Sequence, residues 1–443
     1  MKKQDQNNAS RRDFVINSSL MAGGLMTAPL LSKANFFSGA EDTIKVAVVG
    51  CGGRGTGAAM QALSSKQNVK IVALCDAFKD NVDNCHKELT EEINNSIGEL
   101  AKRLDVPEER KFTGFDGYKK AIALADVVIL ATPPGFRPIH FEEAINQGKH
   151  IFMEKPVATD PAGVQKVLAT AAIAKQKKLN VVVGLQRHYQ NSYRELFKRK
   201  DLIGDITSMQ AWWDNDGVWT RPRKAGQTEM EYQMRNWYYF NWLCGDHITE
   251  QHIHNLDVIN WFKGGYPIKA QGFGGRQVRT SKEHGEIFDH HFVEFEYADG
   301  SILNSQCRHM PGTMSRVDEL LIGTKGRIAC GAAHIKDHSG KIIYQYDTKK
   351  ENNPYQTEHD ELFAAIAKGE YKFADAENGA KSTMTSILGR MATYSGQMVY
   401  WDKAIHSGID IHPKLYAWDA TPPVVPNADG SYPIAIPGIT KYS

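Results

Sequence analysis

Gly50, Gly52 and Gly55 have the G-x-G-x-x-G spacing that dinucleotide-binding proteins use. The first glycine permits a tight turn, the second lets a pyrophosphate approach the backbone, and the third lets a helix pack closely on a strand. An apolar run at residues 43–49 precedes them, and a plausible helix follows, whose free N–H groups would face the phosphates. The spacing therefore predicts a dinucleotide site.

Asp76 ends a second apolar run, residues 69–76. An acid at this place accepts hydrogen bonds from the ribose 2′-OH and repels a 2′-phosphate, so it favours NAD over NADP. The alternative is a glycine turn in another kind of α/β protein, with Asp76 as a helix cap. The order of strand, glycines, helix, strand and acid favours the NAD site.

A second group of reactive side chains lies in residues 245–262, which we expect to form one helix. The group comprises Asp246, His247, Glu250, His252, His254 and Asp257. Helical spacing would place His247, Glu250 or Gln251, and His254 on one face. Such a face has side chains that can bind a metal ion.

Further apolar runs supply the elements that position these residues. Residues 125–132 read as a buried strand that ends in Thr132, Pro133 and Pro134, and residues 150–153 as another that ends in Glu154 and Lys155. Parallel sheets bind ligands at the carboxyl ends of their strands, so both loops should meet the glycine turn.

The chain is long enough for two domains, with 443 residues. We expect a Rossmann domain with a doubly wound parallel sheet at residues 44–187. Alternating strands predict an α+β domain with a large, mostly antiparallel sheet at residues 188–405. Residues 406–443 hold six prolines and read as an extended arm. We expect a homodimer or homotetramer.

The bulk charge excludes some partners. A net charge of +2 with scattered basic residues gives no sign of a nucleic-acid or anionic-membrane surface. No two of the six cysteines have C-x-x-C spacing, so neither a zinc cluster nor a redox dithiol is indicated.

Arg11 and Arg12 precede a short apolar run of small residues, as in a twin-arginine export signal. The run is short and glycine-rich for a membrane span, and no cysteine follows it, so we expect no membrane anchor. We therefore treat residues 1–40 as a signal and linker, and expect a periplasmic or exported protein. Because free NAD is not supplied outside the cytoplasm, the cofactor should stay bound.

The chain resembles the Gfo/Idh/MocA superfamily, which includes glucose–fructose oxidoreductase and inositol dehydrogenase. The resemblance extends over residues 44 to about 330 and rests on the glycine turn, Asp76, the Ala131–Pro134 loop, Glu154-Lys155-Pro156 and the helix at residues 254–261. It implies a cofactor-binding set comprising Gly50, Gly52, Gly53, Arg54, Gly55, Asp76, Thr132, Pro133, Pro134, Glu154 and Lys155.

The resemblance also implies catalytic roles. Lys155 would stabilise the alkoxide as hydride leaves carbon, and His254 would accept the hydroxyl proton. The family has an aspartate four residues before this histidine, whereas this chain has Glu250, which would orient His254 or hold substrate. Because Lys155 already supplies positive charge, we expect no metal. The expected substrate contacts are His247, His252, Arg187, Trp237 and Tyr239.

The resulting hypothesis is an NAD-dependent oxidoreductase acting on a ring hydroxyl of a sugar or glycoside. The alternative is a redox-neutral glycosidase, more distantly similar to glycoside hydrolase family 109, which would form a transient 3-keto sugar and proceed by elimination and hydration. The Tyr-Pro-Thr-His segment associated with that family is absent here. A third possibility is a sugar-binding relative with a vestigial cofactor site, against which the intact motifs argue.

Overall fold

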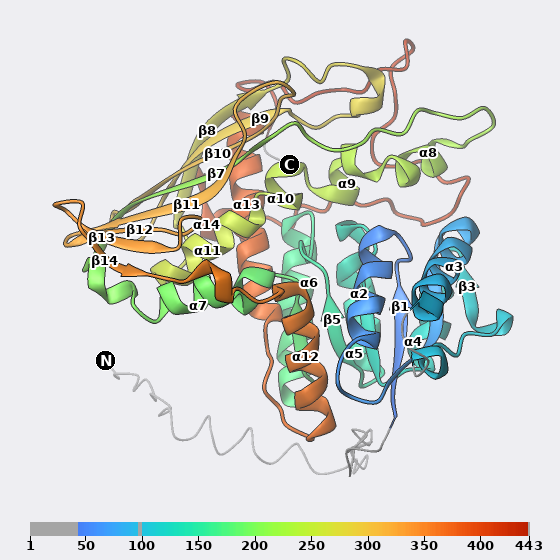
Figure 1. Cartoon of the computed structure of the whole chain (residues 1–443). Helices are drawn as coiled ribbons and strands as arrows, with labels where there is room; N and C mark the ends of the chain where they lie inside the picture. The colour runs from blue at the N-terminus through green and yellow to red at the C-terminus, as the bar shows by residue number, and fades with distance from the viewer. Residues whose placement is uncertain (1–42, 96–99, 442–443) are drawn as a thin grey trace, which may run out of the picture. The chain divides into compact units, whose positions relative to one another are not determined.

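A parallel sheet of six strands holds the dinucleotide motif (Figure 1). The computed structural model describes residues 43–95 and 100–441, so the predicted export signal lies outside the described residues. The strand order is β3-β2-β1-β4-β5-β6. The strands are β1 (Ile44–Val49), β2 (Val69–Asp76), β3 (Lys111–Thr113), β4 (Val127–Leu130), β5 (His150–Met153) and β6 (Val181–Val183). The prediction of a parallel Rossmann sheet is confirmed, although the short edge strand β3 was not predicted.

Both faces of this sheet are covered, as in a doubly wound fold. Val46 and Val48 of β1 pack with helices α2 and α3, whereas Ala47 and Val49 point to the other face, toward α4, α5 and α6. This division follows from the alternation of side chains along a strand. The helices are α2 (Gly53–Leu63), α3 (Lys79–Asn95), α4 (Gly117–Ala123), α5 (Arg137–Asn146) and α6 (Pro161–Gln176).

The register of the strands aligns their carboxyl ends. Val49 pairs with Cys75 on one side and with Leu130 on the other, and Leu130 pairs with Met153. The loops that follow β1, β2, β4 and β5 therefore leave the sheet at one edge. This edge carries the glycine turn, Asp76, the residue 132–134 loop and Lys155.

A second sheet of nine strands follows in the chain, in the order β14-β13-β12-β11-β7-β10-β9-β8-β15. Its pairs are antiparallel except for β7 with β10, which confirms the predicted mostly antiparallel sheet. The strands β12, β13 and β15 have only two to four residues and were not predicted. The nine are β7 (Ile206–Asn215), β8 (Lys269–Gly275), β9 (His290–Glu296), β10 (Ile302–His309), β11 (Arg316–Gly323), β12 (Gly326–Ala329), β13 (His334–Asp337), β14 (Ile342–Gln345) and β15 (Val399–Tyr400).

Helices near the carboxyl end of the chain tie the two sheets together. Helix α13 (Ala376–Ser395) packs against both α6 and β8, and α12 (Pro354–Ala367) packs against α2 and the short 3-10 helix η4 (Gln186–Tyr189). Leu362 and Phe363 of α12 share a core with Val46 and Val48. Other helices of this part of the chain are α7 (Asn191–Phe197), α8 (Glu229–Arg235), α9 (Asn241–Cys244) and α14 (Trp401–Ile405).

The prediction of a single helix over residues 245–262 is wrong. The chain forms a short helix α10 (His247–Glu250) and then α11 (Ile253–Lys263). At the break the N–H of His252 donates to the carbonyl of His247, five residues back, at 3.2 Å. The extra residue in this turn changes the helical phase, so His247 and His254 do not share one face.

The proline-rich arm packs on its own chain. Between residues 406 and 441 the structure has no helix or strand. The ring of Trp418 lies 5.0 Å from that of Phe78 and 4.6 Å from that of Phe115, while Tyr432 packs edge-on to Phe240. The arm thus covers the side of the parallel sheet where Asp76 lies.

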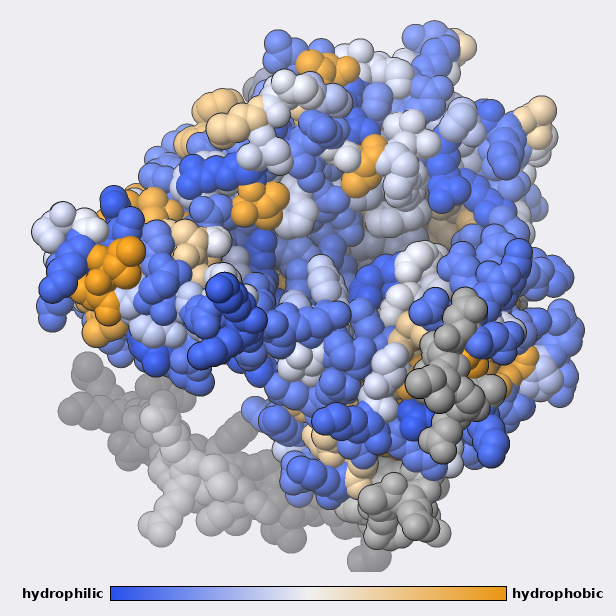
Figure 2. Space-filling model, in the orientation of Figure 1, coloured by the Kyte–Doolittle hydropathy of each residue, from blue (hydrophilic) through white to orange (hydrophobic). Residues whose placement is uncertain are grey.

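The surface of the described residues is mostly hydrophilic on the face drawn in Figure 2. A hydrophobic group on the left of that view lies over β13 and β14, where Ile342 and Ile343 are exposed. Among the described helices none is long and apolar enough to cross a membrane. All six cysteines are buried and free.

Candidate active site

A cavity of about 550 Å³ opens at the carboxyl edge of the parallel sheet. Its first wall consists of the glycine turn and the loops that follow β2, β4 and β5. Its second wall comes from the other half of the chain and includes Trp213, Trp219, Trp237, Gln251 and His254. A cavity of this size can hold a small organic ligand.

The glycine turn has the features that a pyrophosphate requires. Gly52 caps α2 without a side-chain hydrogen bond, and the first turn of α2 has no acidic residue. A Cβ on Gly52 or Gly53 would meet nothing within 4 Å, whereas one on Gly55 would overlap the carbonyl oxygen of Gly50. Gly55 therefore serves helix packing and does not line the cavity, while Gly52 and Gly53 leave room for an anion at the positive end of the helix.

The Asp76 carboxylate lies on the cavity wall at the end of β2. It accepts hydrogen bonds from the N–H groups of Cys51 and Phe78 at 2.8 and 3.0 Å and from the Asn81 amide at 3.0 Å. Burial raises the pKa of Asp76, and these hydrogen bonds partly offset the rise. The carboxylate is thus held in one orientation, with acceptor capacity left for a ribose hydroxyl.

Arg137, which the sequence did not single out, joins two loops of the first wall. Its guanidinium is buried and donates to the carbonyl of Glu154 at 3.0 Å and to the carbonyl of Thr132 at 2.6 Å. Burial lowers the pKa of Arg137 to about 10. The side chain holds the Thr132–Pro134 loop beside the loop that carries Lys155.

Arg54 of the glycine turn lies between two acids. It pairs with Glu154 and, at 3.4 Å, with the fully buried Glu358 of α12. Burial, and to a lesser extent the negative charge of Glu154, raises the pKa of Glu358 well above its usual value. Arg54 therefore links the glycine turn, the loop that carries Lys155 and helix α12.

Lys155 and Glu250 meet across the cavity. The Lys155 ammonium donates to the carbonyl oxygen of Glu250 at 2.7 Å and to its carboxylate at 3.0 Å. The sequence placed Glu250 beside His254, but its carboxylate holds Lys155 because α10 ends at this residue. The contact aims the ammonium at the space between the two walls.

His254 lies on the second wall, in the first turn of α11, with its ring stacked on Trp213 at 5.8 Å. Its Nδ1 is buried without a hydrogen-bond partner among the described residues. Burial, and then the neighbouring charge of Lys155, lowers the pKa of His254 well below its usual value. A neutral imidazole therefore faces the cavity and can accept a proton.

Four of the expected substrate contacts, His247, His252, Arg187 and Tyr239, do not line the cavity, contrary to the expectation from the sequence. His252 hydrogen-bonds Ser305 at 2.6 Å inside the protein, and Arg187 pairs with the buried Glu319. Tyr239 donates to the carbonyl of Val218, and His247, the first residue of α10, is fully buried. The fifth expected contact, Trp237, does line the cavity.

The cavity residues Tyr355 and Arg235 were not predicted from the sequence, which offered Gln251 only as an alternative to Glu250 on one helix face. Gln251 follows Glu250 at the helix break, and Tyr355 comes from α12, about 200 residues beyond Lys155 in the chain. Arg235 stacks over Phe78 and pairs with Asp80. Proximity to His254 was the one available hint for Gln251, whereas long-range packing brings the others to the site.

Comparisons with known proteins agree with this geometry. Residues 44–185 match a family model, GFO_IDH_MocA, described as an oxidoreductase family with an NAD-binding Rossmann fold. The chain is similar to scyllo-inositol dehydrogenase from Lactobacillus casei, solved with NAD(H) and scyllo-inositol. That likeness has a TM-score of 0.60 and 21% identity and covers 82% of this chain and 100% of the other.

Two curated relatives have informative names. Inositol 2-dehydrogenase of Gluconacetobacter diazotrophicus is 27% identical over 54% of this chain and 60% of the relative. The 2,7-anhydro-N-acetylneuraminate hydratase of Mediterraneibacter gnavus is 23% identical over 70% of this chain and 75% of the relative. The chain thus spans about three fifths of the inositol dehydrogenase and three quarters of the hydratase.

Proposed function

We propose that this protein is an NAD-dependent oxidoreductase of the Gfo/Idh/MocA type that acts on a ring hydroxyl of a sugar or glycoside, because residues 44–185 match a family model described as an oxidoreductase family with an NAD-binding Rossmann fold. The observation that carries the proposal is the convergence of Lys155, Glu250 and His254 on one cavity beside the glycine turn. A cation and a neutral imidazole are the groups that such an oxidation requires.

The first wall fits NAD. Gly52 and Gly53 leave open space at the start of α2 for the pyrophosphate, and Asp76 has acceptor capacity for the ribose. Bound NAD would supply the hydride acceptor. The arm residue Trp418 packs behind Phe78 and Phe115, which both line the cavity near Asp76, and this cover supports slow release of the cofactor.

Two side chains of the protein, His254 and Lys155, carry out the proton transfer and stabilise the charge that it produces. His254 accepts the proton of the substrate hydroxyl at Nε2, since Nδ1 is buried away from the cavity. The Lys155 ammonium, fixed by two contacts to Glu250, directs its remaining N–H to the same oxygen and stabilises negative charge there. The stacked Trp213 limits rotation of the His254 ring.

The aromatic second wall suggests the substrate class. Trp213, Trp219 and Trp237 line the cavity, and their flat faces suit the apolar face of a pyranose or an inositol ring. Arg221 lies over the Trp219 ring at 4.8 Å and adds hydrogen-bond donors. These contacts support a cyclic polyol or sugar as the substrate.

The test begins with cofactor content. The purified protein should release NAD on denaturation, and addition of sugars, inositols or glycosides should raise the near-ultraviolet absorbance of reduced nicotinamide. A protein that neither releases NAD nor binds added NAD would contradict the proposal. Lys155→Ala, compared with the wild-type protein at equal NAD occupancy, separates loss of chemistry from loss of cofactor.

The second candidate is a redox-neutral NAD-dependent glycosidase, which would form a transient 3-keto sugar and proceed by elimination and hydration. The named hydratase among the relatives favours it. Glu250 is the carboxylate that the second half of the chain adds to the cavity wall, and it could act as the extra base near the sugar. Release of free aglycone from a glycoside without net reduction of nicotinamide would favour this reaction; reduction without release would favour the oxidoreductase.

Export through the twin-arginine pathway is also part of the proposal. The pathway carries folded proteins, so NAD would be acquired before export and retained after it. Replacement of Arg11 and Arg12 by lysine should keep the protein in the cytoplasm, measured by cell fractionation. Unchanged periplasmic recovery would contradict this route.

A further inference from the structure

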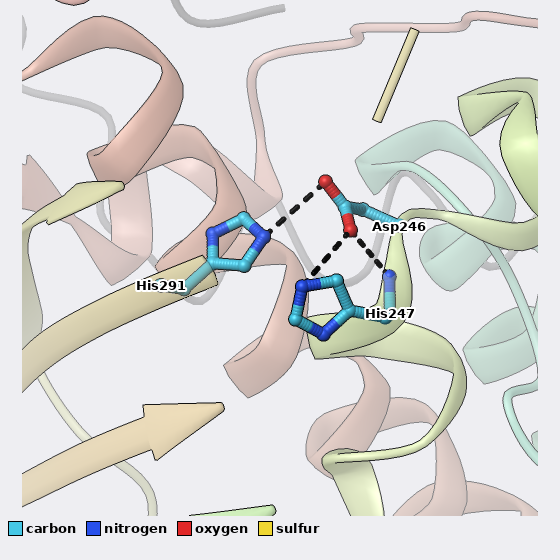
Figure 3. A group of neighbouring side chains, drawn as sticks. All are labelled: Asp246, His247 and His291. Carbon is cyan, nitrogen blue, oxygen red and sulfur yellow. Dashed lines mark hydrogen bonds and ion pairs between the residues drawn. The ribbon is translucent and has the colours of Figure 1, made fainter. Parts of the chain in front are cut away.

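Three buried side chains of types that can bind a metal ion lie together outside the lining of the cavity (Figure 3). Asp246 and His247 stand at the start of α10, and His291 reaches them from β9. One ligand atom from each lies within 4.8 Å of the others. The Nε2 of His291 is 3.2 Å from Oδ2 of Asp246, and the Nε2 of His247 is 3.9 Å from Oδ1. None of the three side chains is exposed.

The hydrogen bonds of His291 determine which ring nitrogen carries its proton. Its Nδ1 lies 2.9 Å from the hydroxyl of Thr393. That hydroxyl donates its own proton to the carbonyl of Gly389 or Arg390, both at 3.1 Å, so it must accept from Nδ1–H. In a neutral His291 the lone pair of Nε2 then points at the Asp246 carboxylate, an arrangement that needs a cation or a second proton.

His247 supplies the independent observation. Both of its ring nitrogens lack a hydrogen-bond partner among the described residues, although the side chain is fully buried. An unsatisfied buried polar group costs about 1–3 kcal/mol, and an ion is one of its ordinary explanations. Figure 3 shows one of these nitrogens directed at Asp246.

The Asp246 carboxylate is fixed in the orientation that a ligand needs. It accepts hydrogen bonds from the N–H of Phe288 at 3.0 Å and the hydroxyl of Tyr394 at 2.6 Å. The backbone of Asp246 has a positive φ of 70°, which few residues adopt without compensation. Outer hydrogen bonds to both Asp246 and His291 match the partners that orient metal ligands in proteins.

We propose that Asp246, His247 and His291 bind a divalent transition-metal ion of the zinc class. Tetrahedral zinc with bonds of 2.0–2.1 Å places neighbouring ligand atoms roughly 3.3 Å apart, close to the separation of His291 and Asp246. A small rotation of the His247 ring brings its Nε2 into the same shell. This inference does not depend on the proposed reaction, and it departs from the expectation that the protein uses no metal.

The ion would have a structural role. His247 stacks on His309 at 4.3 Å, and His309 hydrogen-bonds the cavity residue Gln251 at 3.0 Å. Binding would join α10 to β9 and to Tyr394 of α13. The metal would thus hold the helix break that presents Glu250 and Gln251 to the cavity.

The first experiment measures metal in the wild-type protein. Elemental analysis after gel filtration should find about one zinc ion per chain, and X-ray absorption should show only nitrogen and oxygen ligands at about 2.0–2.1 Å. A protein that has no metal and does not bind added zinc or cobalt would overturn the proposal.

The second experiment assigns the ligands. His291→Gln should lose the zinc, whereas the matched control His290→Gln should keep it, because His290 is half-buried, points to the other face of β9 and pairs with Asp289. Zinc retained at full occupancy in folded His291→Gln would overturn the assignment. If that variant does not fold, two measurements on the wild-type protein still test the site. X-ray absorption should show a zinc ion without sulfur ligands, and cobalt bound in place of zinc should give visible absorption bands; the absence of both would overturn the proposal.

Discussion

The two walls of the cavity are built in different ways. The first wall collects residues that end consecutive parallel strands, so the register of one sheet brings Gly50, Asp76 and Lys155 together. The second wall collects Trp213 from β7 and His254 from α11, which meet through a helix break and long-range packing. Sheet topology thus positions the first wall, whereas a local backbone irregularity and long-range packing position the second.

The largest effect is expected at the contact between the walls. In the proposed reaction Lys155→Ala removes the charge that Glu250 holds toward the substrate oxygen, so kcat/KM should fall by about 10³-fold with NAD still bound. Lys166→Ala is the matched control, since Lys166 also pairs with a carboxylate, Glu142, but on the surface. Steady-state kinetics on both variants provide the measurement. Equal activities would remove Lys155 from the mechanism.

His254 tests the second wall. His254→Asn should lower kcat/KM by about 500-fold, with little change in NAD affinity, while the exposed His338→Asn should have no effect. An asparagine variant that loses NAD instead would show that the two walls are not separate in function.

The pH dependence follows from the lowered pKa of His254. Burial and Lys155 lower this pKa, so the neutral, proton-accepting form persists as pH falls below the usual histidine value. The pH profile of kcat/KM should therefore show no loss near the ordinary histidine pKa between about pH 5 and 8. A loss centred near that ordinary value would mean that His254 is solvated or is not the base.

The sequence could predict the first wall because each of its motifs directly follows an apolar strand. It predicted His254 and Trp237 of the second wall but not how they are arranged, because the turn at residues 250–252 shifts the helical phase by one residue without any proline or glycine to mark it. Hence His254 faces the cavity and His247 faces Asp246. Short strands such as β15 and isolated packing residues such as Arg137 carry too little local pattern to be recognised.

Two glycines of the first wall should separate folding from cofactor binding. Gly55→Ala forces a Cβ against the carbonyl of Gly50 and should lower the free energy of unfolding by about 3 kcal/mol. Gly52→Ala meets nothing within 4 Å, so it should leave stability within about 0.5 kcal/mol yet weaken NAD binding. Denaturant unfolding and NAD titration measure the two effects. A stability loss in Gly52→Ala together with a loss of NAD binding alone in Gly55→Ala would contradict these roles.

The smallest effect is expected where the arm covers the first wall. Trp418→Ala removes the ring that packs on Phe78 and Phe115, and an aromatic contact of this kind contributes about 0.5–1.5 kcal/mol. The Kd of NAD should therefore rise by at most about tenfold, and its release should become faster. Trp401→Ala, whose ring packs on Tyr266 away from the cavity, is the control. An unchanged Kd for Trp418→Ala would mean that the first wall retains NAD through its strand-end loops alone, and that the arm does not contribute to cofactor retention.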